Sequence, residues 1–335
     1  MLISPSLFCF FLVMILGIVF SVSSVHWLGI WLGMEINLFG ILPIIMGRRQ
    51  SSEIEATIKY YFIQALGSSV LMVGLVMNNF LFGSEMFGSM FLLSGLFIKL
   101  GVVPFYFWVP SVMNSVSWFC CFLLSTFQKL GPLFLTMSIL EMESVMIVIG
   151  CLSSVVGGVG GFNQSQLRAL LAYSSIGHSG WMLGGLVVSV GGAFVYFISY
   201  FFTCAIVFFV LSMISLFNHN QITKCLAAES SSVFYLLSIG FLSMSGLPPF
   251  VMFFGKVIVV FSFNKFLVST WVYLLGAVVS MYFYLNAVFL WSSSGSMVFF
   301  GSHSSRSLVN NILFGTILVS GFPLMIFFIY SMISF

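Results

Sequence analysis

Apolar residues run through this chain in long stretches that short polar breaks interrupt. Eleven of these stretches approach the ~20 residues that a helix needs to cross the hydrocarbon core of a bilayer. They are residues 2–22, 24–46, 57–79, 87–108, 116–138, 144–162, 166–189, 192–217, 232–261, 267–291 and 309–334. The stretches lack the apolar–polar alternation of membrane strands, and helices satisfy their own backbone hydrogen bonds in lipid. The pattern therefore predicts an all-α polytopic membrane protein with about eleven transmembrane helices.

Composition supports this class of protein. Of the 335 residues, 61% are hydrophobic and only 5% are charged, which is too apolar for a soluble domain of this size. A chain this apolar is expected to have membrane lipids as partners. The formal net charge of +3 is small and dispersed, so we expect no nucleic acid as a partner. The six cysteines lack the paired spacing of a metal site or a disulfide framework, and we interpret them as small buried residues. The first stretch has no basic segment before it and no cleavage pattern, so we expect no cleaved targeting segment.

Charged residues between the stretches predict an orientation, because basic residues gather on the side from which insertion starts. With eleven helices, the loops on the side of the N-terminus hold Arg48, Arg49, Lys59, Arg168, Lys224 and Arg306, together with the acids Glu53, Glu55 and Glu229. The opposite loops hold Lys265, Glu85, Glu141 and Glu143. Six basic residues against one place the N-terminus inside and the C-terminus outside.

Four charged residues lie near the middles of the apolar stretches: Glu35, Lys99, Lys129 and Lys256. A charge at the bilayer centre costs at least ~2.5–3.5 kcal/mol, so it usually marks an ion or proton pathway. Snorkelling to the interface is the alternative, but a lysine some ten residues from either end of its helix is too deep for it. Glu35 and Lys99 can form an ion pair if their helices touch. Lysine suits proton transfer because, unlike arginine, it can lose its proton when buried.

Two stretches contain Gly/Pro clusters that predict interrupted helices. One runs from Gly101 through Pro104 to Pro110, and the other contains Gly246 with Pro248 and Pro249. An isolated proline usually makes only a kink. Here a lysine lies near each cluster, and paired interruptions are typical of inverted-repeat transporters with an ion site at the breaks. We therefore expect one transmembrane domain over 1–335, an antiporter-like fold of two inverted five-helix repeats (about 1–138 and 144–291) and a C-terminal helix at 309–334.

His178 also lies within an apolar stretch and titrates near neutral pH. It either hydrogen-bonds a neighbouring helix or links Lys129 to Lys256 in a proton path. No nucleotide, flavin, haem or iron–sulfur motif accompanies it. The pair Gly158 and Gly160 lacks the third glycine, the strand and the acidic partner of a dinucleotide fingerprint.

Several runs of residues occur in an order that a known family shares. They are Gly33-Met34-Glu35-Ile36-Asn37, Lys59-Tyr60-Tyr61-Phe62-Ile63-Gln64-Ala65, Pro104-Phe105 through Trp108-Val109-Pro110, Gly161 to Arg168 and on to Trp181-Met182, and Gly246-Leu247-Pro248-Pro249-Phe250 with Lys256. Over nearly its whole length the chain resembles the subunit 2 family of mitochondrial NADH–ubiquinone oxidoreductase. These proteins are antiporter-like subunits in the membrane arm of respiratory complex I.

The resemblance implies a proton-translocating subunit of an H⁺-translocating NADH:ubiquinone reductase in the mitochondrial inner membrane, with the N-terminus in the matrix and the C-terminus in the intermembrane space. It implies partnership with neighbouring membrane-arm subunits. It also implies that no cofactor binds to this chain, because NADH, FMN, the iron–sulfur clusters and ubiquinone would belong to other subunits. By position, Glu35 and Lys99 match the family's carboxylate–lysine pair, Lys129 the central lysine and Lys256 the lysine of the second broken helix. Tyr106 stands where a histidine is usual and Ser111 where an acid is usual, which puts in doubt any proton step there that needs either group.

The resulting hypothesis is a hydrated polar axis from Glu35 and Lys99 to Lys129 and on to Lys256, with His178 as an optional link. A signal from a neighbouring subunit would separate Glu35 from Lys99, and the freed ammonium would repel the proton on Lys129. Two alternatives stay open at this point. One is a freestanding cation/proton antiporter of the same fold, and the other is a non-conducting scaffold whose buried charges lock helices together.

Overall fold

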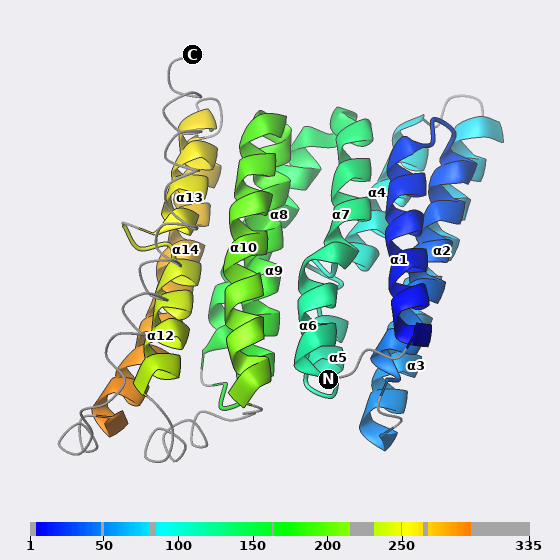
Figure 1. The fold of residues 1–335 in the computed structure, drawn as a ribbon. Helices are drawn as coiled ribbons and strands as arrows, with labels where there is room; N and C mark the ends of the chain where they lie inside the picture. The colour runs from blue at the N-terminus through cyan, green and yellow to red at the C-terminus, as the bar shows by residue number, and fades with distance from the viewer. Residues whose placement is uncertain are drawn as a thin grey trace. The chain divides into compact units, whose positions relative to one another are not determined.

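The computed structural model describes residues 5–47, 50–80, 85–162, 164–214, 231–248, 250–263 and 267–295. The chain divides into two compact units, Met1–Ile149 and Gly150–Phe335, whose helices are drawn in Figure 1. The helices of the first unit are α1 (Pro5–Ser23), α2 (Trp27–Ile45), α3 (Ser51–Phe80), α4 (Glu85–Leu100), α5 (Trp108–Met113), α6 (Trp118–Ser125), α7 (Phe127–Thr136) and the 3₁₀ helix η1 (Met137–Met142). Next come α8 (Glu143–Gly161), which begins before the division, α9 (Leu167–Val188), α10 (Val190–Ile214), α12 (Ser231–Ser245), α13 (Val251–Ser262) and α14 (Leu267–Gly295).

The helices follow the apolar stretches of the sequence. Each predicted stretch from 2–22 to 267–291 coincides with one helix or with consecutive short helices. Within the described ranges, six segments are long and apolar enough to cross a membrane: Trp27–Ile45, Ser51–Asn78, Trp118–Ile139, Glu143–Gly161, Val190–Met213 and Leu267–Trp291. The stretch 309–334 lies outside the described residues. The all-helical class is thus as predicted, while the count of eleven stays a prediction.

In the first unit, α1 and α2 approach each other backbone to backbone. A Cβ atom added at Gly33 would lie 2.5 Å from the Ser21 nitrogen, and one added at Gly40 would lie 2.6 Å from the Met14 nitrogen. Small residues allow such close approach in membrane helix pairs, where dispersion and hydrogen bonds replace the hydrophobic drive. This packing fixes the rotation of α2, the helix that carries Glu35.

The first interruption separates α4 from α5. α4 ends in a Schellman motif, in which Val102 N donates to Phe97 O at 3.3 Å and Gly101 N donates to Ile98 O at 3.3 Å. Gly101 has φ +68°, a conformation that favours glycine. Pro104 lies in the irregular segment that follows, whereas Pro110, which we expected to break a helix, lies in the first turn of α5. A proline is tolerated there because the first-turn N–H groups have no partner within the helix.

The second interruption separates α12 from α13. α12 ends at Ser245, Gly246 follows with φ +77°, and α13 begins at Val251. Pro248 lies between the two helices, while Pro249 lies outside the described residues. This Gly/Pro cluster therefore ends a helix within an apolar stretch, as the first cluster ends α4.

A third irregularity was not expected. We predicted one helix over 116–138, but Thr126 separates α6 from α7 with φ −119° and ψ −74°. Its hydroxyl donates to Phe122 O at 2.6 Å, and Lys129 N bonds Thr126 O, three residues back. A hydroxyl that bonds the carbonyl four residues earlier bends a helix. The bend lies just before Lys129.

The start of α3 corrects a second expectation. Glu53, Glu55 and Lys59 were placed in a loop, but all three lie in α3. Glu53 is buried in its first turn, where a helix dipole favours an acid, and Glu55 forms an exposed ion pair with Lys59 one turn later.

Candidate functional site

Glu35 and Lys99 meet in the first unit. Lys99 Nζ lies 3.8 Å from Glu35 Oε1, and the exposed side-chain fractions are 4% for the lysine and 19% for the glutamate. Lys99 is in the last turn of α4, where the helix dipole also favours a positive charge. The distance is within ion-pair range but too long for a hydrogen bond. The two charges therefore compensate each other without being locked together.

A hydrogen-bonded cluster includes Asn37, two residues after Glu35 on α2. Asn37 and Gln128 exchange two side-chain bonds, with Asn37 Nδ2 at 2.8 Å from Gln128 Oε1 and Gln128 Nε2 at 3.0 Å from Asn37 Oδ1. The Tyr60 hydroxyl donates to the same Gln128 oxygen at 3.2 Å. The cluster fastens α7 to α2 and α3, and all three side chains are buried. Buried polar networks hold helices in a specific arrangement when every member is satisfied.

Lys129 follows Gln128 directly and is 4% exposed. Its helix, α7, packs against α4, which carries Lys99, and against α1. The amide cluster fixes the position of the neighbouring residue, so the backbone of Lys129 is held close to the helices that carry Glu35 and Lys99.

In the second unit, Lys256 reaches from α13 to the interruption. Its Nζ donates to Ser245 O at 2.8 Å, which satisfies a carbonyl at the end of α12. A Cβ atom added at Gly246 would lie only 2.8 Å from that Nζ. Gly246 is thus required both by its backbone conformation and by the approach of the lysine.

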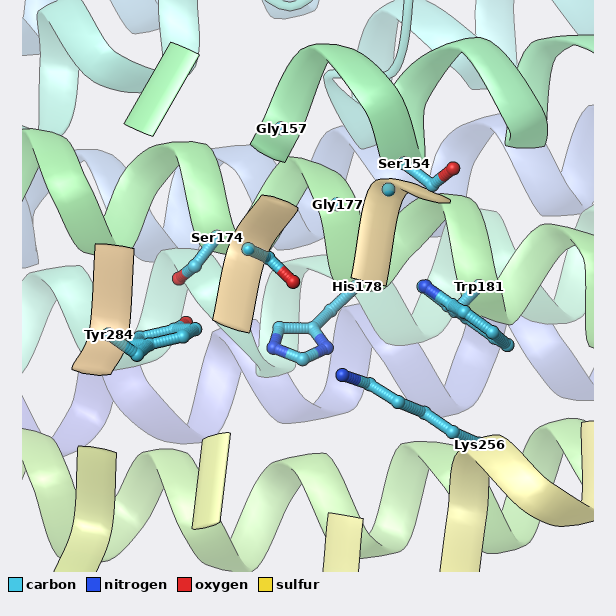
Figure 2. Close-up of a pocket in the computed structure, with 10 residues that line it drawn as sticks. Ser154, Gly157, Ser174, Gly177, His178, Trp181, Lys256 and Tyr284 are labelled. Carbon is cyan, nitrogen blue, oxygen red and sulfur yellow. The ribbon is translucent and has the colours of Figure 1, made fainter. Parts of the chain in front are cut away.

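Lys256 also lines a small cavity together with His178. About 10 Å³ of the cavity is open to the centre of a water molecule, which is close to the space that one water needs. The lining residues are Ser154, Gly157, Ser174, Gly177, His178, Trp181, Lys256, Gly276, Ser280 and Tyr284. Figure 2 shows the ammonium end of Lys256 pointing toward the imidazole of His178, while the hydroxyl of Ser174 points toward Tyr284. Such a site can transfer a proton between an amine and an imidazole.

His178 is held by aromatic residues of α10. Its Nδ1 lies 2.8 Å from the Tyr196 hydroxyl, and its ring centroid lies 4.9 Å from that of Tyr200. The structure therefore contains the hydrogen bond to a neighbouring helix that was one interpretation of this histidine, and it also places the ring beside Lys256, as the other interpretation requires.

The two departures from the family pattern lie at the first interruption. Tyr106 stacks on Phe107 with ring centroids 4.1 Å apart. Ser111 is exposed, and its hydroxyl donates to Trp108 O at 2.8 Å. Neither side chain forms a hydrogen bond with Glu35 or Lys99 in the described part of the chain. Tyr106 and Ser111 therefore do not take the place of the family's histidine and acid beside the ion pair.

Sequence reasoning singled out the charges but missed the neutral polar side chains around them. Asn37 and Tyr60 stood in the motifs without a role, and neither Gln128 nor Tyr196 was assigned one. The available signal was a polar residue within three positions of a buried charge, as for Asn37 and Gln128. Within the described part of the chain, no group of three or more His, Cys, Asp or Glu side chains is placed to hold a metal ion.

Comparison with known proteins places this geometry in a family. The family model described as NADH:quinone oxidoreductase/Mrp antiporter, TM, matches residues 24–283. NADH-ubiquinone oxidoreductase chain 2 of Locusta migratoria is 33% identical over 282 residues, which cover 82% of each chain. The protein of the same name from Lumbricus terrestris is 33% identical over 290 residues, 85% of this chain and 86% of the relative. A chain of respiratory complex I from Thermus thermophilus, solved with bound aureothin, superposes with a TM-score of 0.76 at 21% identity, over 87% of this chain and 76% of that one.

Interrupted helices with buried lysines define an antiporter-like membrane protein, and the solved relative shares this fold. The chain belongs to the NADH:quinone oxidoreductase/Mrp antiporter family and, within it, to the NADH-ubiquinone oxidoreductase chain 2 proteins.

Proposed function

We propose that the chain is the proton-translocating chain 2 subunit in the membrane part of respiratory complex I. The observation that carries this proposal is the pair of interrupted helices, each with a buried lysine at the break. Lys99 lies beside Glu35 at the first break, and Lys256 lies beside His178 at the second. Buried ionisable groups at broken helices are the usual place of ion transfer in transporters.

The proton path runs within each unit along the residues that the geometry brings together. In the first unit, separation of the loosely held Glu35–Lys99 pair frees an ammonium close to the helix that carries Lys129, and its charge repels the proton there. In the second unit, the proton passes between Lys256 and His178 in their common cavity. The step from Lys129 to Lys256 would join residues of the two units, and it is part of the proposal.

The energy for this movement comes from other subunits, which oxidise NADH and reduce ubiquinone. This chain binds none of the redox cofactors, and its partners are the neighbouring subunits of the membrane arm and the surrounding lipids. The protein lies in the mitochondrial inner membrane. The excess of basic residues on one side supports an N-terminus in the matrix and a C-terminus in the intermembrane space. Two inverted repeats would place the two interruptions in corresponding positions.

The freestanding antiporter is the second candidate function, because the matching family model also includes Mrp antiporters. Relatives named NADH-ubiquinone oxidoreductase chain 2, which match over more than four-fifths of their length, favour the subunit.

Native-gel separation distinguishes the two functions. Mitochondria are extracted in mild detergent, the gel is stained for NADH dehydrogenase activity, and mass spectrometry locates this chain. We expect it in the largest NADH-active band. A known membrane-arm subunit serves as the positive control and an unrelated inner-membrane carrier as the negative control. Recovery of the chain only in a small inactive band would contradict membership of the redox complex and would favour the antiporter.

A further inference from the structure

A hydroxyl from another helix holds the imidazole of His178. The Tyr196 hydroxyl lies 2.8 Å from Nδ1, and the exposed fractions are 5% for His178 and 0% for Tyr196. His178 belongs to α9 and Tyr196 to α10, and these two helices pack together. Because no bulk water reaches the pair, this hydrogen bond controls the orientation of the ring.

The phenol of Tyr196 is itself fixed on two sides. Its ring lies parallel to that of Trp181, with centroids 6.2 Å apart and an interplanar angle of 9°. On another side Gly255 leaves just enough room, since an added Cβ atom would lie 3.1 Å from Tyr196 Cδ2. A side chain packed this closely holds its hydroxyl oxygen in one position. A group that orients a proton-transfer residue must be held in this way.

A neutral imidazole has one donor and one acceptor nitrogen, and the hydrogen bond at one nitrogen decides which of them carries the proton. A phenol that donates to Nδ1 leaves the ring proton on Nε2. We propose that Tyr196 is a positioning residue for proton transfer at His178, holding the neutral imidazole in the Nε2–H tautomer and in one orientation beside Lys256. This inference rests on the proposed function, in which His178 and Lys256 exchange a proton.

The transfer step balances without any chemical change at Tyr196. The Tyr196 hydroxyl first turns its own proton away from Nδ1 and so frees the lone pair of that nitrogen. The Lys256 ammonium then loses a proton and becomes a neutral amine, and His178 gains the proton at Nδ1 and becomes an imidazolium. The Tyr196 oxygen accepts the hydrogen bond from the new Nδ1–H, and the hydroxyl keeps its own proton. Tyr196 therefore acts through His178 in both charge states.

Tyr196→Phe tests this role in the intact complex, because it keeps the ring and removes the hydroxyl. The purified complex is reconstituted into liposomes, and the protons moved per NADH oxidised are measured. We expect a lower ratio than in the wild type, with NADH oxidation retained when the proton gradient is collapsed. Tyr273→Phe is the matched control, since Tyr273 is a fully buried tyrosine of the same unit whose hydroxyl faces Gly150 and Gly184. We expect the control to keep the wild-type ratio.

A double-mutant cycle separates positioning from a purely structural effect. If Tyr196 acts through His178, the variant with both Tyr196→Phe and His178→Gln loses no more of the ratio than His178→Gln alone. Additive losses, or a full ratio in Tyr196→Phe, would overturn the inference. Should Tyr196→Phe fail to assemble, Tyr196→Gln keeps a donor for Nδ1 and must retain more of the ratio than Tyr196→Leu. Equal ratios in that pair would also overturn it.

The single variant His178→Gln keeps this test distinct from a test of the proposed function. A full ratio in His178→Gln, with a reduced ratio in a Lys129 variant, would overturn the role of Tyr196 and the step through His178, while proton translocation by this subunit stands. Full ratios in both variants would overturn both.

Discussion

Replacing Glu35 by Gln should strongly reduce the amount of assembled complex. Lys99 would lose its counter-charge while its side chain remains 4% exposed. Removing one partner of a buried ion pair typically costs about 3–5 kcal/mol, because the other charge is left uncompensated. The assembled amount is read from the NADH-active band of a native gel, and the proton-to-NADH ratio is measured on the complex that remains. We expect both to fall.

The control for this prediction is the double variant Glu35→Gln with Lys99→Met. Because it removes both charges, it should recover most of the assembly that the single variant loses. It should not recover the proton-to-NADH ratio, since the ion pair is the element that opens. Glu55→Gln is the surface control, because Glu55 pairs with Lys59 at an exposed position. Normal assembly in Glu35→Gln would contradict the ion pair seen in the structure.

Gly246→Ala should damage the second interruption by two independent effects. At φ +77° an alanine is strained by roughly 1–2 kcal/mol, which is the usual cost of the left-handed conformation. In addition, the new Cβ atom would lie 2.8 Å from Lys256 Nζ and 3.0 Å from Lys256 Cδ. The ammonium would be displaced from Ser245 O and from the cavity. We expect a lower thermal stability of the complex and a lower proton-to-NADH ratio.

Gly191→Ala is the matched control for this change. Nothing lies within 4 Å of a Cβ atom added at Gly191, which is in the first turns of α10. Alanine is a better helix former than glycine by up to about 1 kcal/mol, so this variant should be neutral or slightly stabilising. Equal thermal stability and an equal proton-to-NADH ratio in the two variants would show that position 246 does not require a glycine.

The positions of the helices and of the two interruptions could be predicted from the sequence. Apart from the two interruptions and the bend at Thr126, the apolar stretches that the structure describes form helices, because a bilayer leaves the backbone few alternatives. The glycines that end α4 and α12 could be recognised since each stands next to prolines inside an apolar stretch. Charges in such stretches are rare, so Glu35, Lys99, Lys129 and Lys256 also stood out.

The contacts of neutral polar residues could not be predicted in this way. Asn37 and Gln128 are 91 residues apart, and amides in a membrane helix have several potential partners. The bend at Thr126 depends on a side-chain rotamer that bonds Phe122 O, and threonine adopts more than one rotamer in helices. Glu53 was misplaced because an acid before an apolar stretch is equally typical of a loop and of a first helical turn.

The central claim is that this chain moves protons through its buried lysines, and Lys129 offers the most direct test. Lys129→Met removes the charge, whereas Lys129→Arg keeps the charge on a group that does not release its proton. The proton-to-NADH ratio of each reconstituted complex is compared with that of Lys59→Met, a lysine replaced at an exposed position. Proton transfer predicts a reduced ratio in both Lys129 variants and a normal ratio in the control. A full ratio in Lys129→Met would contradict the claim, and a ratio restored only by arginine would indicate a scaffold that needs the charge alone.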